Sequence, residues 1–74
     1  MGWPDYIEQN PDIMSGRAVF KETRLTVEHI LREWSLAGTE QELLEGYPRL
    51  RPAHLRAALA YAASVLASEE VLFA

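Results

Sequence analysis

Three arginines and one histidine form the densest group of chemically versatile side chains in the sequence. They are Arg49, Arg51, His54 and Arg56, and no acidic residue lies between positions 47 and 68. A guanidinium binds phosphate oxygens, and its planar fork also matches the O6 and N7 atoms of guanine. The group therefore favours contact with nucleic acid, with Arg56 as the base contact, Arg49 and Arg51 as phosphate clamps and His54 as a neutral polar or phosphate contact.

No comparable group of residues indicates catalysis or metal binding. Ser15 has no base at a recognisable spacing, and His29 and His54 are expected on different helices. The neighbouring glutamates in the chain are explained by helix capping and solvation. With no cysteine and only two histidines, the sequence predicts neither a disulfide nor a structural zinc site. We therefore expect no enzymatic activity and no cofactor.

The charge is unevenly distributed along the chain. The net charge is −4, which on its own argues against a nucleic-acid partner. However, residues 1–46 carry −5, residues 47–68 carry +3, and Glu69 and Glu70 add −2. The basic segment is compact, so charge alone leaves two interpretations open: a nucleic-acid contact or a solvated helix face.

Capping residues and apolar spacing predict two helices in the middle of the chain. Thr26 is a favourable N-cap, and Gly38 is suited to end the helix that follows it. The apolar stripe of this first helix consists of Val27, Ile30, Leu31 and Trp34. The segment Thr39–Glu42 has the form of a capping box, so a short second helix begins there. It must end near Pro48, because the residue before a proline is pushed out of the helical region.

A longer third helix is predicted from Pro52 to about Ser68. Proline suits the first helical position, where its missing amide costs nothing. The apolar stripe of this helix consists of Leu55, Ala58, Leu59, Ala62, Val65 and Leu66. On another face, Ala53, Ala57 and Ala60 permit close approach to bases or to a second helix, although alanine is also simply the best helix former.

A short helix, a tight turn and a longer helix, braced by a preceding helix, give the order of a helix-turn-helix. The expected fold is therefore mostly α: a three-helix, homeodomain-like helix-turn-helix bundle with short N-terminal β-strands. We expect one domain over residues 1–74, divided into an N-terminal arm (1–25), the helical core (26–68) and a C-terminal tail (69–74). In this arrangement Arg49, Arg51, Ala53, His54, Arg56 and Ala57 form the DNA-binding surface.

The chain length predicts a homodimer. A chain of 74 residues buries only about 60% of the surface that its unfolded form exposes, so its stability alone is marginal. The arm holds short strand candidates around Tyr6–Ile7 and Ala18–Phe20, which we expect either to pair across a dimer interface or to lie over the helices. The expected interface residues are Trp3, Tyr6, Ile7, Val19 and Phe20.

The sequence has no apolar stretch long enough to cross a bilayer and begins without the features of a signal peptide. We therefore expect a cytoplasmic protein with no membrane partner.

Several stretches of the sequence resemble one bacterial family. They are residues 10–27, Ala37-Gly38-Thr39, Tyr47-Pro48-Arg49-Leu50 and residues 57–62. Together they are similar to the domain of unknown function 433 family, over about residues 5–65. Two positions depart from the family pattern: Ser15-Gly16-Arg17-Ala18 replaces Gly-Gly-Lys-Pro, and Glu22 replaces the glycine of Lys-Gly-Thr-Arg. If that turn requires a positive φ, Glu22 is strained or the turn differs.

The resemblance implies a homeodomain-like helix-turn-helix protein that acts as an antitoxin beside a ribonuclease-type toxin. The expected function is therefore a DNA-binding regulator that binds its own operator and neutralises a cognate toxin protein. Arg24 is expected to pair with an acid of its own domain or of the dimer mate. The tail residues Val71, Leu72 and Phe73 are expected to bind either that partner or the protein's own dimer. The alternative function is a protein-interaction or adaptor module that uses the same fold without DNA.

Overall fold

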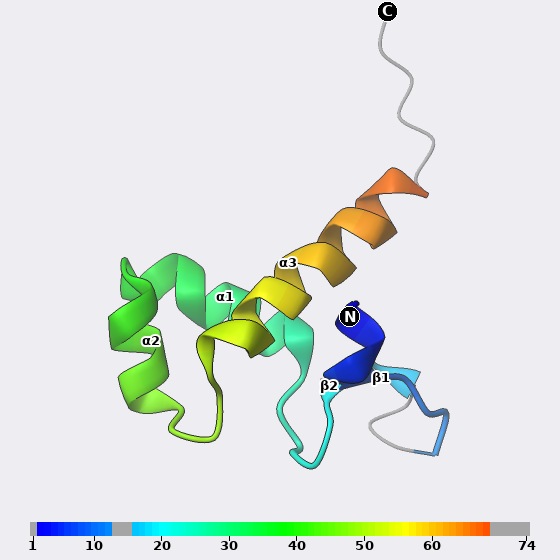
Figure 1. Ribbon diagram of the computed structural model, residues 1–74, viewed down its shortest axis with the longest axis horizontal. Helices are drawn as coiled ribbons and strands as arrows, with labels where there is room; N and C mark the ends of the chain where they lie inside the picture. The colour runs from blue at the N-terminus through cyan, green and yellow to red at the C-terminus, as the bar shows by residue number, and fades with distance from the viewer. Residues whose placement is uncertain (1, 13–15, 69–74) are drawn as a thin grey trace, which may run out of the picture.

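The computed structural model describes residues 2–12 and 16–68 of the chain (Figure 1). The structure is mostly helical, with three α-helices and a short two-stranded antiparallel sheet, as the sequence predicted. The elements in chain order are a 3-10 turn η1 (Trp3–Asp5), β1 (Ile7–Glu8), β2 (Val19–Phe20), α1 (Val27–Ala37), α2 (Glu40–Gly46) and α3 (Pro52–Ala67). The predicted tail contacts Val71, Leu72 and Phe73 lie outside the described residues.

The helix ends follow the local capping signals of the sequence. The Thr26 hydroxyl accepts a hydrogen bond of 3.1 Å from the backbone N–H of His29, and the Thr39 hydroxyl accepts one of the same length from Glu42. Gly38 ends α1 with a φ of 87°, a conformation that an L side chain rarely adopts. Pro52 is the first residue of α3. The predicted helix boundaries are therefore confirmed.

The two strands pair with each other inside one chain. Ile7 lies opposite Phe20 and Glu8 lies opposite Val19, and Thr26 adds an isolated bridge to Val19 just before α1. A two-stranded sheet is hardly stable alone in water, so it needs a hydrophobic partner. The helices provide that partner, because Ile7 of β1 and Phe20 of β2 are buried in the same core cluster as residues of all three helices.

The N-terminal segment contributes to the core and is not a detached arm. Ile7, Val19 and Phe20 are at most 2% exposed in the single chain. Their side chains therefore offer almost no surface to a second copy, which corrects their expected place in a dimer interface. The remaining buried apolar residues are Ala18, Val27, Ile30, Leu43, Leu50, Leu55, Ala57 and Ala58.

Helix α3 packs against the rest of the described chain through its residues up to Tyr61, which meets Trp3 edge-on. Leu55 and Ala58 are buried, but Leu59, Val65 and Leu66, which continue the predicted apolar stripe, are 51%, 43% and 61% exposed. Figure 1 shows the reason: α3 extends past the body formed by the other elements. Periodicity identified the helix, but no neighbour within the described residues buries Leu59, Val65 or Leu66.

A strained turn joins β2 to α1. The Phe20 carbonyl accepts hydrogen bonds from the backbone N–H of Thr23 at 3.1 Å and from its hydroxyl at 2.7 Å, which closes a four-residue turn. Glu22 occupies the third position of this turn with a φ of 65°. In turns of this form the third position favours glycine, because a Cβ there clashes with the backbone. The positive φ expected at this position is present, and a glutamate adopts it.

Replacing Glu22 with glycine is expected to stabilise the protein by about 0.5–1 kcal/mol. Removal of Cβ relieves about 1–2 kcal/mol of left-handed strain, and the greater freedom of glycine in the unfolded chain offsets part of that gain. Urea unfolding followed by circular dichroism measures the change. Lys21→Gly, at a neighbouring residue without a positive φ, is the control and is expected to lower stability. A loss of stability in Glu22→Gly would contradict the strain.

Candidate nucleic-acid interface

The loop between α2 and α3 carries the first arginines of the predicted site. It consists of Tyr47–Arg51, and the Leu50 N–H donates to the Tyr47 carbonyl at 2.9 Å. Leu50 is buried, so it anchors the loop while Arg49 and Arg51 on either side remain exposed. Leu50 is a core residue that the apolar spacing of the predicted helices does not identify. The alternation of exposed arginine and buried leucine in Arg49-Leu50-Arg51 is the signal that indicates it.

His54 stabilises the start of α3. The backbone N–H of Arg51 donates to His54 Nδ1 at 3.0 Å, and the His54 N–H donates to the Arg51 carbonyl at 2.9 Å. The imidazole also packs edge-on against Tyr6 and Phe20, with ring centroids 5.2 and 5.8 Å away. With Nδ1 bonded to the backbone and the ring packed against two aromatic side chains, His54 has a capping and packing role, and its predicted contact with DNA stays a prediction.

The predicted alanine stripe of α3 faces another element of the same chain. Ala57 is 5% exposed and Ala53 is half-buried. The 3-10 turn η1 packs against this side of α3, where the Trp3 and Tyr61 rings meet edge-on at 4.9 Å. The small residues were expected to allow close approach either to bases or to another helix. Ala57 is buried by contact with another helical segment, so its side chain is not exposed to DNA. Trp3 and Tyr6 are half-buried by these contacts within the chain.

The arginines themselves are free to bind a ligand. Arg49, Arg51 and Arg56 are all exposed. Within residues 2–12 and 16–68 the single ion pair joins Arg32 to Glu28, at 2.6 Å. Arg49 makes one long hydrogen bond of 3.4 Å, from Nη1 to the backbone carbonyl of Glu22. The positive charges of the predicted site are therefore not neutralised by neighbouring acids in the described chain.

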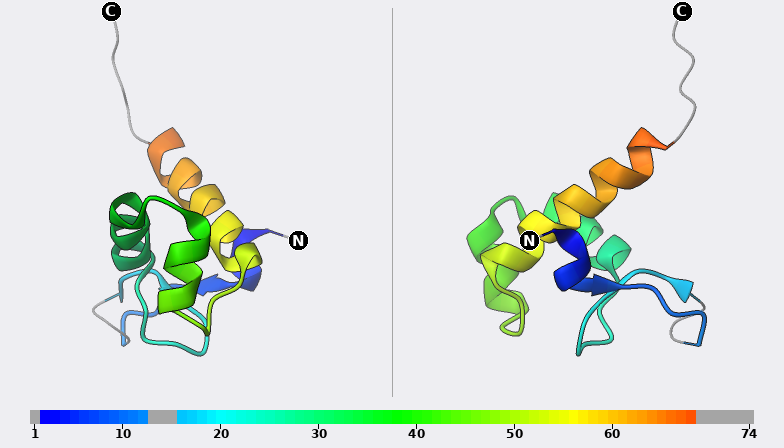
Figure 2. Two further views of the ribbon diagram at one scale, coloured as in Figure 1. Left: turned by 90° about the vertical axis from the view of Figure 1, so that its left-hand side faces the viewer. Right: turned by 45° about the vertical axis from the view of Figure 1, so that its right-hand side comes forward.

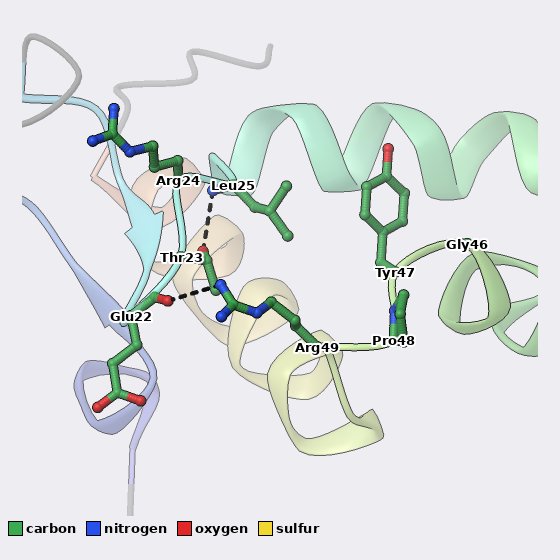
Figure 3. A pocket seen from close by; sticks show the side chains of 8 residues that line it. All are labelled: Glu22, Thr23, Arg24, Leu25, Gly46, Tyr47, Pro48 and Arg49. Atoms are coloured by element: carbon green, nitrogen blue, oxygen red, sulfur yellow. Dashed lines mark hydrogen bonds between the residues drawn. The ribbon is translucent and has the colours of Figure 1, made fainter.

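The contact between Arg49 and Glu22 joins two loops that are distant in the sequence. The β2–α1 turn and the α2–α3 loop enclose a groove of about 710 Å³ (Figure 3). It is lined by Glu22, Thr23, Arg24, Leu25, Gly46, Tyr47, Pro48 and Arg49. Both loops belong to stretches that resemble the family named above. Arg24, expected to pair with an acid of its own domain, has no such partner among the described residues and lines this groove instead.

Tyr47 fixes the α2–α3 loop to α1. Its hydroxyl donates to Glu33 Oε1 at 3.4 Å and lies 3.0 Å from His29 Nε2. Partial burial, followed by the nearby Glu33 carboxylate, raises the pKa of Tyr47 above its ordinary value. The hydroxyl therefore stays protonated at neutral pH and holds one wall of the groove in place.

Five of the seven basic residues of the chain belong to these two loops and the first turns of α3. In Figure 1 and in both views of Figure 2, the β2–α1 turn and the α2–α3 loop reach the same end of the molecule, opposite the C-terminal end of α3. We call this region the basic end; its residues are Lys21, Arg24, Arg49, Arg51 and Arg56. Glu22 is its one acidic residue, and Figure 3 shows its carboxylate turned away from Arg49.

The part of the chain that the structure describes contains no group of three or more potential metal ligands. No helix within that part has the length and apolar character needed to cross a membrane.

The fold and this region define a small, mostly helical protein with one short antiparallel sheet and a basic end formed by two loops and a helix N-terminus. The family model described as "Protein of unknown function (DUF433)" matches residues 7–62, and the chain belongs to that family. No curated protein and no solved structure shows a significant match to the chain.

Proposed function

We propose that this protein binds double-stranded DNA through its basic end, with α2 and α3 acting as a homeodomain-like helix-turn-helix. The observation that carries the proposal is a group of five basic residues with one acid at one end of a protein whose net charge is −4, none of the five in an ion pair within the described residues. In a chain with an excess of acids, such a locally basic region favours an anionic partner.

The exposed face of α3 supports the recognition role. Pro52, Arg56 and Ala60 are exposed along its first turns, whereas Ala57 is buried. Arg56 is accompanied by small neighbours and is therefore able to approach base edges in a major groove. Arg49 and Arg51, on the loop before the helix, are placed to contact the phosphates on either side.

The finer parts of the proposal rest on the resemblance to the family. We propose that the protein binds its own operator as a homodimer and neutralises a ribonuclease-type toxin. An operator-bound dimer places two copies of α3 in successive major grooves, about 34–36 Å apart. Electrophoretic mobility shifts with the DNA upstream of the gene test the first part, and co-purification with the product of the neighbouring gene tests the second.

An Arg51→Ala, Arg56→Ala double variant is expected to bind that DNA roughly 10- to 100-fold more weakly at about 0.15 M salt. The slope of log K against log salt should also fall by about 1, because the loss of Arg51 removes one phosphate contact, whereas Arg56 is assigned to a base. Fluorescence anisotropy across a salt series measures both. The matched control is Arg17→Ala, Arg32→Ala, which removes the same charge outside the basic end. Equal weakening by both variants would contradict a localised interface.

A protein-interaction module is the second candidate function, and one observation favours it. Leu36, Leu59, Val65 and Leu66 are large apolar residues that are between 43% and 76% exposed. Exposed apolar surface of this kind marks protein contacts when it is contiguous. Absence of DNA binding at low salt, for the free protein and for its complex with the neighbouring gene product, would favour this function over the helix-turn-helix.

A further inference from the structure

The groove of Figure 3 combines apolar walls with two arginines that have no ion-pair partner among the described residues. Leu25, Tyr47 and Pro48 supply the apolar surface, and Arg49 supplies a positive charge beside them. Arg24 lies at the edge of the groove with its guanidinium turned away from Arg49, and the carboxylate of Glu22, which also lines the groove, is turned away as well. A complementary ligand must therefore present carboxylates next to apolar side chains, because carboxylates alone would leave the walls uncovered and apolar groups alone would leave both cations unmatched.

The chain itself contains such a segment, which we call the acidic-apolar segment. It is Glu69-Glu70-Val71-Leu72-Phe73, with two acids, no base and three large apolar residues in succession. These residues lie outside the part of the chain that the structure describes. In composition the segment matches the groove: two carboxylates for two guanidiniums, and apolar side chains for the leucine, tyrosine and proline walls.

The segment cannot reach the groove of its own chain. Helix α3 has 16 residues, which corresponds to about 24 Å of length. The groove adjoins the loop before the first residue of α3, and Figure 2 shows the last turn of α3 at the opposite end of the molecule. The five residues from Ser68 to Leu72 span about 17 Å even when fully extended. A second copy of the chain must therefore supply the groove.

We propose that the acidic-apolar segment of one copy binds in the groove of a second copy, and that reciprocal exchange of the two segments forms the dimer. In the absence of DNA, Glu69 and Glu70 pair with Arg24 and Arg49, and the apolar residues that follow cover Leu25, Tyr47 and Pro48. On DNA, phosphates replace the two carboxylates at these arginines and the apolar contact keeps the two copies together. The two-fold arrangement uses the same surfaces on both chains, so the association closes at two. It replaces the interface expected on Ile7, Val19 and Phe20, which the single chain buries.

Charge exchange tests the proposal in the absence of nucleic acid, so its outcome is independent of the proposed DNA binding. The groove variant is Arg24→Glu, Arg49→Glu and the segment variant is Glu69→Arg, Glu70→Arg. Sedimentation velocity at low salt is expected to show a dimer for the unmodified chain and at least a tenfold weaker dimerisation constant for each variant. An equimolar mixture should recover a dimer, because both groove–segment contacts of the mixed dimer join opposite charges.

All of the substituted groove positions are exposed and lie outside the core, and circular dichroism confirms that each variant is folded before it is sedimented. A second variant, Phe73→Ala, keeps both acids and is also expected to weaken the dimer, because it removes the apolar part of the contact. A monomeric unmodified chain, a dimer retained by either reversed variant, or a mixture that remains monomeric would each overturn the proposal.

Discussion

Replacing Phe20 with alanine is expected to destabilise the protein by about 3–5 kcal/mol and to leave a large fraction of it unfolded at 37 °C. Phe20 is 0% exposed and is the largest fully buried side chain. Truncation of a buried phenylalanine removes its transfer free energy and leaves a cavity that the neighbours fill only in part. A folded domain of this length is stable by only about 4–11 kcal/mol in total, so one substitution removes much of the margin.

The measurement is urea unfolding followed by circular dichroism and by the fluorescence of Trp3 and Trp34. Leu66→Ala is the control, because Leu66 is 61% exposed in the described chain and its truncation is expected to change stability by less than about 0.5 kcal/mol. If Phe20→Ala cost less than 1 kcal/mol, the strands would not be part of the core.

The elements of this fold were predictable because their boundaries depend on local chemistry. Thr26, Thr39 and Pro52 each act through backbone groups within a few residues, and a sequence contains all the information that such contacts need. Gly38 belongs to the same class, since its left-handed conformation depends only on the last turn of α1. The hydroxyl bonds and dihedral angles of the structure agree with all of these signals.

The buried face of α3 was not predictable in the same way. Alanine and leucine occupy most of its circumference, so the apolar period does not select one side. Packing against η1 buries Ala57, and Leu59 is exposed because no element of the described chain covers its side of α3. Both outcomes depend on which side of α3 the first residues of the chain pack against. Local helix propensity does not determine that long-range contact.

Part of the candidate site was likewise predictable from local sequence, and part depends on long-range contacts. Exposed Arg51 and Arg56 follow from their place at the start of a helix whose N-terminus was predicted. The groove could not be predicted in this way, because it forms where Arg49 reaches the backbone carbonyl of Glu22, 27 residues earlier in the sequence. Every residue has a backbone carbonyl, so the type of residue 22 does not indicate that its carbonyl accepts this hydrogen bond. The sequence did indicate that Glu22 occupies a position where the family has glycine, and the positive φ there shows that the turn keeps its conformation despite the side chain.

Substitution of His54 with alanine is expected to destabilise the protein by about 2 kcal/mol. The variant loses the Nδ1 acceptor for the Arg51 N–H, which is worth about 1 kcal/mol at a helix start, and the edge-on contacts with Tyr6 and Phe20, which are worth a similar amount. Both losses act at the junction between the N-terminal segment and α3. The change in the midpoint of thermal or urea unfolding measures their sum.

His54→Gln separates the structural role of this residue from a contact with DNA. Glutamine at the third helical position supplies an acceptor for the capping N–H but no ring, so it is expected to recover about half of the lost stability. At a temperature where the variant is fully folded, its DNA affinity should match that of the unmodified protein, whereas the Arg51→Ala, Arg56→Ala variant remains weak. A folded His54→Gln protein that binds DNA tenfold more weakly would place the imidazole in the DNA contact after all. The side chain would then have a function in addition to closing the first turn of α3.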